Sequence, residues 1–249
     1  MKIRSFKRKK NGFYQIFLEE MEPIIIHEDL ILKYNLLIEK KLDKHLLNKI
    51  EIENKKYIVY QTAINLLKAR LRSTKELKEI LIKKEFIKKD IEDVIITLTK
   101  QGYLNDFVYA ESFVHDKIKF SKDGPEKIKS NLINNGINNN DIIKAMKIYT
   151  NELEQEKLKK IIDSKIKQNK NKSTSVLKRK ILITLINNGY HKENIIPFLD
   201  EVKNNNDQDL YQKTYEKERK KLERKYSGKE LEYRLNQKMY SKGFYKNDY

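Results

Sequence analysis

The sequence has no cysteine, and only 7 glycines and 3 prolines occur among its 249 residues. Without cysteine the chain can form neither a disulfide nor a thiolate zinc site, so nothing in it requires an oxidising compartment. The scarcity of glycine and proline is typical of a chain dominated by helices with few sharp turns. Hydrophobic residues make up 39% of the chain, which is sufficient for several small cores and argues against wholesale disorder.

Segments that would direct the chain to a membrane are also missing. No run of about 18 apolar residues is present that could span a bilayer. The basic start MKIRSFKRKK is followed by Asn11 and Gly12, where a secretory signal would have its apolar stretch. We therefore expect a cytoplasmic protein with no membrane partner.

Catalytic motifs are equally scarce. The four histidines lie far apart, and no two have the i, i+4 spacing of a helical metal site. There is no HExxH, no G-x-S-x-G and no glycine-rich phosphate loop. Because the many carboxylates are scattered along polar helix faces, we expect no enzymatic activity, no cofactor and no bound metal.

The chain does contain one unit that is repeated four times. Its anchor residues, separated by 51, 53 and 54 positions, are Phe86, Ile137, Tyr190 and Phe244. Nine positions before the anchors stand Leu77, Ile128, Ile181 and Leu235. Five positions before them stand Leu81, Leu132, Leu185 and Met239, and directly before them stand Glu85, Gly136, Gly189 and Gly243. Since each unit of a repeat array packs mainly on its neighbours, we expect an elongated, curved molecule.

The offsets within each unit predict helices. The apolar positions nine and five before the anchor lie about one helical turn apart on the same side, and the following glycine suits a left-handed helix C-cap. The Asp or Asn four residues after the anchor is predicted to be the N-cap of the next helix, at Asp90, Asp141 and Asn194. A further amphipathic helix is predicted upstream, over residues 57–72, 107–119 and 153–166. Each unit is therefore expected to form three short helices.

The N-terminal segment follows a different pattern. Two β-prone runs, residues 3–8 and 13–18, flank the dipeptide Asn11-Gly12, which is a hairpin signal. A third apolar run over residues 24–26 follows a proline. A small antiparallel sheet of two or three strands is therefore expected here.

These patterns predict a mainly α fold of tandem three-helix repeats with a small cap that contains a β-hairpin. Within the cap, helices are predicted over residues 27–35 and 43–53. The cap is too small to be stable by itself, so we expect it to pack on the first repeat. The predicted divisions are the cap at 1–55, three-helix repeats at 56–105, 106–151 and 152–204, and a truncated fourth repeat at 205–249.

The charge is strongly basic, with 54 basic and 36 acidic side chains and a net charge of +18. An excess of this size favours polyanionic partners such as nucleic acid. Only eight of the basic residues are arginine, and a general preference for lysine explains the residue type better than it explains the excess. The excess is concentrated in residues 2–10, 156–180 and 213–229.

The middle basic segment is the best candidate for a nucleic-acid contact. Residues 156–180 hold ten basic side chains and two acids, and the polar run 168–175 is predicted to be a loop that lets lysines project. A run of charge is often only a solvated helix face, so both interpretations stay open. The candidate contacts in this segment are Lys167, Lys170, Lys172, Lys178, Arg179 and Lys180.

Three motifs in the first two units carry a family resemblance. They are Arg70-Leu71-Arg72-Ser73 followed by Glu76-Leu77, then Gly102-Tyr103-Leu104-Asn105-Asp106 followed by Ala110 and Phe113-Val114, then Gly124-Pro125 with Leu132 and Gly136-Ile137. In this order and spacing they resemble the pattern of the RecX regulatory family, and the N-terminal segment and truncated fourth repeat resemble its longer Gram-positive members. The departures are Thr74 and Lys75, where Glu is common, and Glu85 in place of the usual glycine.

The resemblance implies a monomeric protein that modulates the RecA recombinase, and with it recombination, DNA repair and the SOS response. Similar proteins lie along the groove of the RecA filament on single-stranded DNA and dampen its ATPase, strand-exchange and co-protease activities. A sequence-nonspecific binder of single-stranded nucleic acid is the alternative, and a protein scaffold without DNA contact is a weaker one. Arg70 and Arg72 are further candidates, either for partner contact or for pairing with acidic groups between repeats.

Overall fold

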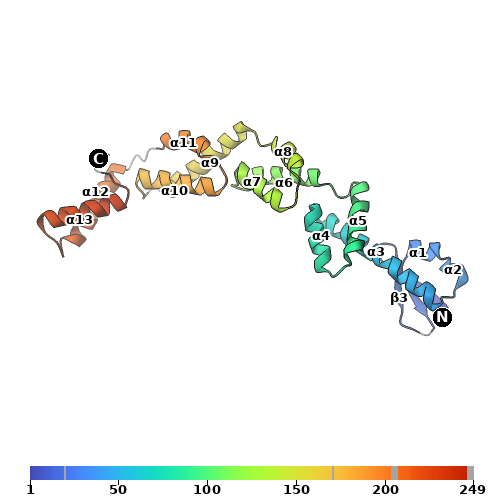
Figure 1. Ribbon diagram of the computed structural model, residues 1–249. Coiled ribbons are helices and arrows are strands. Elements are labelled where there is room, and N and C mark those ends of the chain that lie inside the picture. Colours follow the sequence, from blue (N-terminus) through green and yellow to red (C-terminus); the bar gives the residue numbers. More distant parts are fainter. Residues whose placement is uncertain (20, 170, 203–206, 246–249) are drawn as a thin grey trace. The chain divides into compact units, whose positions relative to one another are not determined.

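Helices dominate the chain, and one small sheet lies at its N-terminal end (Figure 1). The structure is a computed structural model that describes residues 1–19, 21–169, 171–202 and 207–245. Two compact units are distinguished, namely Met1–Tyr109 with Asn135–Asn138, and Ala110–Asn134 with Asn139–Tyr249. The predicted class, a mainly helical chain of three-helix repeats with a β-containing cap, is confirmed.

The sheet forms as the hairpin signal predicts. Strands β1 (Ile3–Arg8), β2 (Phe13–Leu18) and β3 (Ile24–His27) pair antiparallel in the order β1-β2-β3. The turn residues Asn11 and Gly12 have φ of 60° and 78°, which is the left-handed backbone that tight hairpins require. The predicted three-stranded piece is therefore confirmed.

The rest of the cap is helical, and here one prediction is wrong. Helices α1 (Glu28–Lys33) and α2 (Leu36–Glu39) are short, but α3 runs without a break over Lys44–Ala69. The predicted pair of helices at 43–53 and 57–72 is thus a single helix of 26 residues. The polar residues between them contain neither glycine nor proline, so nothing interrupts the backbone hydrogen bonds.

One buried polar side chain joins α3 to the sheet. Asn54 accepts a hydrogen bond from the His27 N–H at 3.0 Å, and its amide donates to the Ile25 carbonyl at 2.6 Å. These bonds satisfy backbone groups on β3, which is an edge strand. The cap therefore has its own core and shares its longest helix, α3, with the first repeat.

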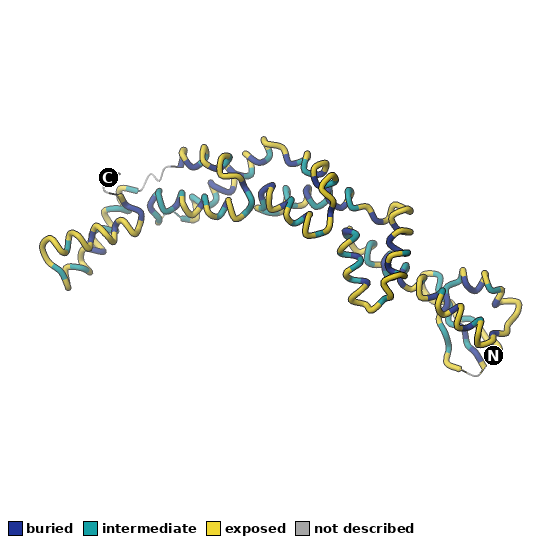
Figure 2. The backbone as a smooth tube through the Cα atoms, viewed as in Figure 1, coloured by how far each residue is buried: buried dark blue, intermediate teal, exposed yellow. Residues whose placement is uncertain are grey.

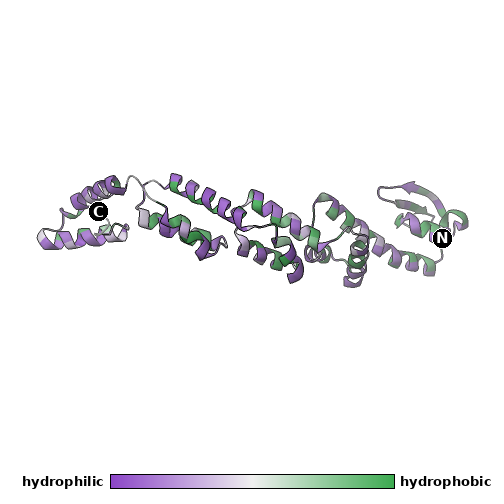
Figure 3. Cartoon of the chain, turned by 90° about the horizontal axis from the view of Figure 1, so that it is seen from above, coloured by the Kyte–Doolittle hydropathy of each residue, from purple (hydrophilic) through white to green (hydrophobic). Residues whose placement is uncertain are grey.

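The remaining helices follow the predicted units. In chain order they are α4 (Thr74–Lys83), α5 (Lys88–Lys100), α6 (Asp106–Phe120), α7 (Pro125–Asn134), α8 (Asn139–Met146), α9 (Asn151–Gln168), α10 (Thr174–Asn187), α11 (Lys192–Asp200), α12 (Asp207–Leu222) and α13 (Gly228–Ser241). Buried and exposed residues alternate along these helices (Figure 2), as do hydrophobic and hydrophilic ones (Figure 3). We call the second helix of each repeat, namely α4, α7, α10 and α13, its middle helix.

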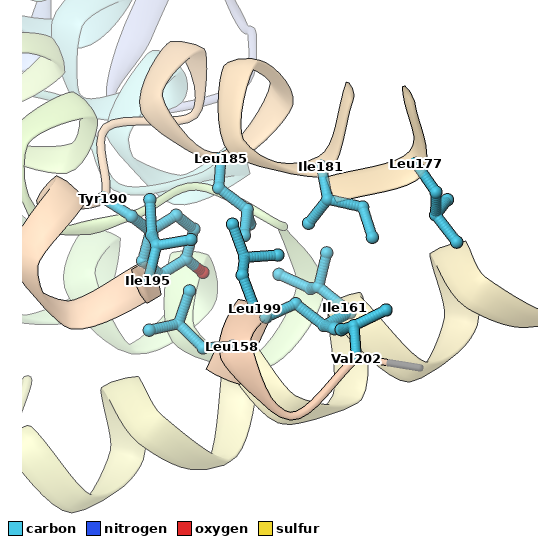
Figure 4. Close-up of a cluster of buried hydrophobic side chains, with 10 residues drawn as sticks. Leu158, Ile161, Leu177, Ile181, Leu185, Tyr190, Ile195, Leu199 and Val202 are labelled. Atoms are coloured by element: carbon cyan, nitrogen blue, oxygen red, sulfur yellow. The ribbon is translucent and has the colours of Figure 1, made fainter. Parts of the chain in front are cut away.

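The apolar positions predicted from the repeat form the cores. All eight residues at nine and five positions before the anchors are at most 3% exposed. In the third repeat Ile181 and Leu185 of α10 meet Leu158 of α9 and Leu199 of α11 in one cluster (Figure 4). The stripe on each middle helix is therefore confirmed as its buried face.

The predicted N-caps of three helices are wrong. Helices α5, α8 and α11 begin at Lys88, Asn139 and Lys192, so that Asp90, Asp141 and Asn194 lie in their first turns. Each helix starts almost directly after the anchor, because the turn before it is only a few residues long. An acid in the first turn still interacts favourably with the positive end of the helix dipole.

Asp106 of the family motif is the first residue of α6 but does not cap it. Its neighbour Asn105 caps the helix by accepting from the N–H groups of Phe107 and Val108 at 3.0 and 3.2 Å. The Asp106 carboxylate instead accepts from the Thr74 N–H at 2.7 Å, at the start of α4. Asp207 does the same for Thr174 at the start of α10, at 3.2 Å. The carboxylate is therefore a link between helices and not a local cap.

The glycine before the anchor is required by the packing of one repeat on the next. In the second unit, the carbonyls of Asn188 and Gly189, just after α10, accept from the N–H groups of Gly124 and Glu126 at 2.6 and 3.1 Å. The end of one middle helix thus satisfies free donors at the start of the middle helix of the preceding repeat. A Cβ atom on Gly189 would lie 2.4 Å from the Lys127 nitrogen, so no side chain fits.

The glycine turn after a middle helix also lies close to the preceding middle helix at the two other junctions between repeats. A Cβ on Gly136 would lie 2.7 Å from Lys75, and one on Gly243 would lie 2.5 Å from Val176. Glu85 takes the equivalent place in the first repeat, has φ of 63° and is exposed. No repeat precedes it, so no helix start has to fit against this turn. The departure of Glu85 from the family pattern is therefore explained.

We expect Gly189→Ala to destabilise the protein far more than Gly102→Ala. Both residues have positive φ, but nothing lies within 4 Å of a Cβ on Gly102. Gly102→Ala should cost about 1 kcal/mol of left-handed strain, and Gly189→Ala about 2 kcal/mol more, because the backbone of α7 must shift. Urea unfolding followed by circular dichroism measures both. Equal losses would show that the turn does not press against α7.

Candidate functional site

The Arg-Ser motif builds the start of α4. The Ser73 hydroxyl accepts from the Glu76 N–H at 3.1 Å, as in a capping box. The guanidinium groups of Arg70 and Arg72 both pair with the Glu76 carboxylate, and Arg72 Nε also donates to the Leu66 carbonyl at 3.2 Å. The Arg72 side chain is only 12% exposed, whereas that of Arg70 is 57% exposed. Of the two, Arg70 is the one that a partner can reach.

The two halves of the basic segment differ in how their charge is used. In the first half, Lys160 pairs with Glu156 at 2.7 Å. Lys157 donates to the carbonyls of Lys117 and Asp123 at 3.1 and 3.3 Å, and burial lowers the pKa of its ammonium. Lys157 thus joins the third repeat to the second, Lys160 is paired within α9, and both are poor candidates for a partner contact.

In the second half of the segment, three cations form no ion pair with the described residues. Lys167 lies in the last turn of α9, and Arg179 and Lys180 lie on α10; all three are exposed and form no ion pair within the described part of the chain. Lys178 is half-buried beside them. Lys170 lies outside the described residues. The charge here is available to an anion.

The end of α9, the loop after it and the first turns of α10 bring these cations together. The short loop between α9 and α10 places Lys172 close to Lys180, and its Nζ donates to Asn169 Oδ1 at 2.8 Å. The close contact with Lys180, partial desolvation and the charge of Lys165 lower the pKa of the Lys172 ammonium. Like charges repel, so an anion that settles between them gains electrostatic free energy. Lys165 of α9 joins the cluster although the sequence did not single it out, because the sequence does not show which helix residues lie near Lys172 of the loop.

The C-terminal basic segment is partly neutralised by its own acids. Arg219 pairs with Glu223 at 2.6 Å, and Lys242 pairs with the buried Glu218 at 2.9 Å. Glu218 also lies 3.7 Å from Lys221. This segment is therefore a weaker anion site than the second half of the middle one.

No constellation typical of an enzyme emerges from the part of the chain that the structure describes. A groove of about 910 Å³ lies in the first unit beside His27, Tyr57 and Asp93. His27 is held there by aromatic rings, with Tyr57 stacked at 4.4 Å and Phe13 edge-on at 5.1 Å. Among the described residues no group of three or more His, Cys, Asp or Glu side chains could hold a metal ion. None of the described helices is both long and apolar enough to cross a membrane.

Fold and surface together define a mainly helical protein, built from three-helix repeats and carrying a concentrated basic surface. Family models match two of the repeats: residues 60–98 match the first three-helix domain of RecX, and residues 105–146 match the second. The chain belongs to the RecX family of regulatory proteins.

Relatives and solved structures agree. The regulatory protein RecX of Oceanobacillus iheyensis is 27% identical, over 98% of this chain and 92% of its own. That of Listeria monocytogenes is 29% identical, over 78% of this chain and 72% of its own. A crystal structure of the regulatory protein RecX superposes with a TM-score of 0.67 at 22% identity, covering 80% of this chain and 99% of its own, which supports the fold. RecX from Lactobacillus salivarius gives 0.55 at 29% identity, covering 60% of this chain and 99% of its own.

Proposed function

We propose that this protein binds the RecA nucleoprotein filament and mainly inhibits its recombinase, ATPase and co-protease activities. It acts as a cytoplasmic monomer that lies in the groove of the filament. Membership of the RecX family supports this proposal. One observation in the structure carries it further, namely an exposed apolar residue that every repeat presents at the same place.

Four positions before each anchor, next to a fully buried core residue, stands a large apolar side chain that is between 44% and 67% exposed. We call these four the recurring apolar residues: Ile82, Ile133, Ile186 and Tyr240. Single exposed apolar residues are common on protein surfaces and need no explanation. Four at equivalent positions are different, because they lie outside the buried cores of the repeats; of the four, Tyr240 contacts another ring, that of Tyr245 at 4.9 Å.

A partner made of identical subunits offers the same surface several times. The RecA filament is such a partner, so each repeat can make one similar contact with it. Individually weak contacts that are linked in one chain add up to high affinity. The basic segment would then lie near the phosphates of the DNA that the filament encloses.

The test is a titration of RecA with the purified protein during ATP hydrolysis on single-stranded DNA. We expect substoichiometric protein to slow both ATP hydrolysis and strand exchange. A cognate RecA that is unaffected by equimolar protein at low salt would contradict the proposal.

The crowded cations around Lys172 favour one alternative, a nonspecific binder of single-stranded nucleic acid. Binding by charge alone needs no recombinase and weakens steeply as salt rises. Filament binding through apolar contacts should depend less on salt. Affinities for bare DNA and for the filament, measured over the same salt range, distinguish the two.

A further inference from the structure

The N-terminal sheet has two different faces. Ile16 and Leu18 of β2 are buried against the helices of the cap, together with Ile26 of β3. The alternate residues of β2 point to the other side and are only half-buried, and Ile25 on β3 is 51% exposed. We call this second side the open face; its residues are Ser5, Lys7, Phe13, Gln15, Phe17 and Ile25.

The strand register places two aromatic rings on the open face. Phe17 pairs with Ser5 across the sheet, and Phe13 pairs with His27, whose ring holds it edge-on. The two phenylalanines are four residues apart on one strand, which separates them by about 13 Å along it. Partly exposed rings on a rigid strand can stack with unpaired bases, and every base has a ring face to offer.

Cations surround this face on one side. The six basic residues between positions 2 and 10 are all exposed, and no acid occurs among them. They lie just before the edge strand β1, along it and in the turn after it, and none forms an ion pair with the residues that the structure describes. Acids lie at both ends of the sheet: a Cβ on Gly12 would lie 3.2 Å from the Glu28 carboxylate, and the Glu19 N–H donates to the Lys2 carbonyl at 3.1 Å. The sheet thus combines positive charge with aromatic rings.

We propose that the open face binds single-stranded DNA, with bases stacked on Phe13 and Phe17 and phosphates held by Lys7 of the same face. Double-stranded DNA keeps its bases stacked inside the helix and offers no free ring face. An acidic protein segment would satisfy the cations but would have no need of the rings. The site is separate from the basic segment and does not depend on RecA.

The test measures binding of a short fluorescent oligo(dT) to the full chain by anisotropy, without RecA. Phe17→Leu should weaken binding about fivefold or more, with an unchanged salt dependence because the lost contact is not ionic. Lys7→Gln should weaken binding and reduce the slope of log affinity against log salt by about 0.7. Phe120→Leu is the matched control, since Phe120 is an exposed ring beside Lys119 on α6 and should have no effect.

Two further variants show whether a loss of binding comes from the missing ring or from misfolding. Phe17→Tyr keeps the ring and should bind as the parent does, and Ile25→Phe adds a ring and should bind more tightly. The proposal is overturned if Phe17→Leu binds oligo(dT) as the parent does, if Phe17→Tyr loses as much as Phe17→Leu, or if Phe17→Leu weakens binding to duplex DNA of the same length equally. Because RecA is absent, none of these results bears on inhibition of the filament.

Discussion

Replacement of all four recurring apolar residues by serine is expected to abolish inhibition of RecA. Each residue contributes one apolar contact per repeat, so each single change should weaken filament binding by roughly fivefold. The combined variant should lose more than about a hundredfold, because linked contacts multiply in affinity. The measurements are filament binding and RecA ATPase rate as functions of protein concentration.

The control for this experiment is a second quadruple variant. Leu32, Ile38, Ile52 and Phe120 are equally exposed apolar residues that do not recur at one position of the repeat. Their replacement by serine should leave inhibition unchanged. Both variants should be about as stable as the parent, since exposed substitutions rarely change stability by more than about 0.5 kcal/mol. If the first variant inhibits RecA as well as the second, the repeats do not contact the filament through these side chains.

Charge reversal in the basic segment is expected to have the second large effect. Lys167, Lys172, Arg179 and Lys180, all changed to Glu, lower the net charge from +18 to +10. Affinity for bare single-stranded DNA should fall by about a hundredfold or more at low salt. The slope of log affinity against log salt should decrease by about 3, because each lost phosphate contact removes about 0.7. Binding to the filament should fall less, since the apolar contacts remain.

An equal change of charge elsewhere separates a site from a general effect. Lys213, Lys217, Lys220 and Lys225 are exposed in the C-terminal basic segment, and their replacement by Glu also gives +10. This variant should retain most of its affinity for DNA. Equal losses in the two variants would mean that only net charge matters. The sheet described above should provide the residual binding of the first variant.

The sequence alone determined the features that depend on local patterns. The hairpin at Asn11-Gly12 follows from a backbone preference of two residues, and the buried faces of the middle helices follow from a helical period within each one. Leu77 and Leu81 are buried in the structure because any helix with that spacing turns both toward the same side. The resemblance to the RecX family also follows from the sequence, through the three short motifs in the first two units.

The tertiary structure decided what depends on a neighbour. Glycine at position 189 is required by the approach of α7, and Arg72 is covered because Glu76 and the Leu66 carbonyl meet it. The sequence predicts that Leu185 is buried, but it does not say that the neighbouring Ile186 stays exposed and is not covered by another helix. Contacts between helices depend on three-dimensional distances, whereas patterns in the chain report only the preferences of each segment by itself. For that reason the helices were predictable, while the surfaces they leave for a partner were not.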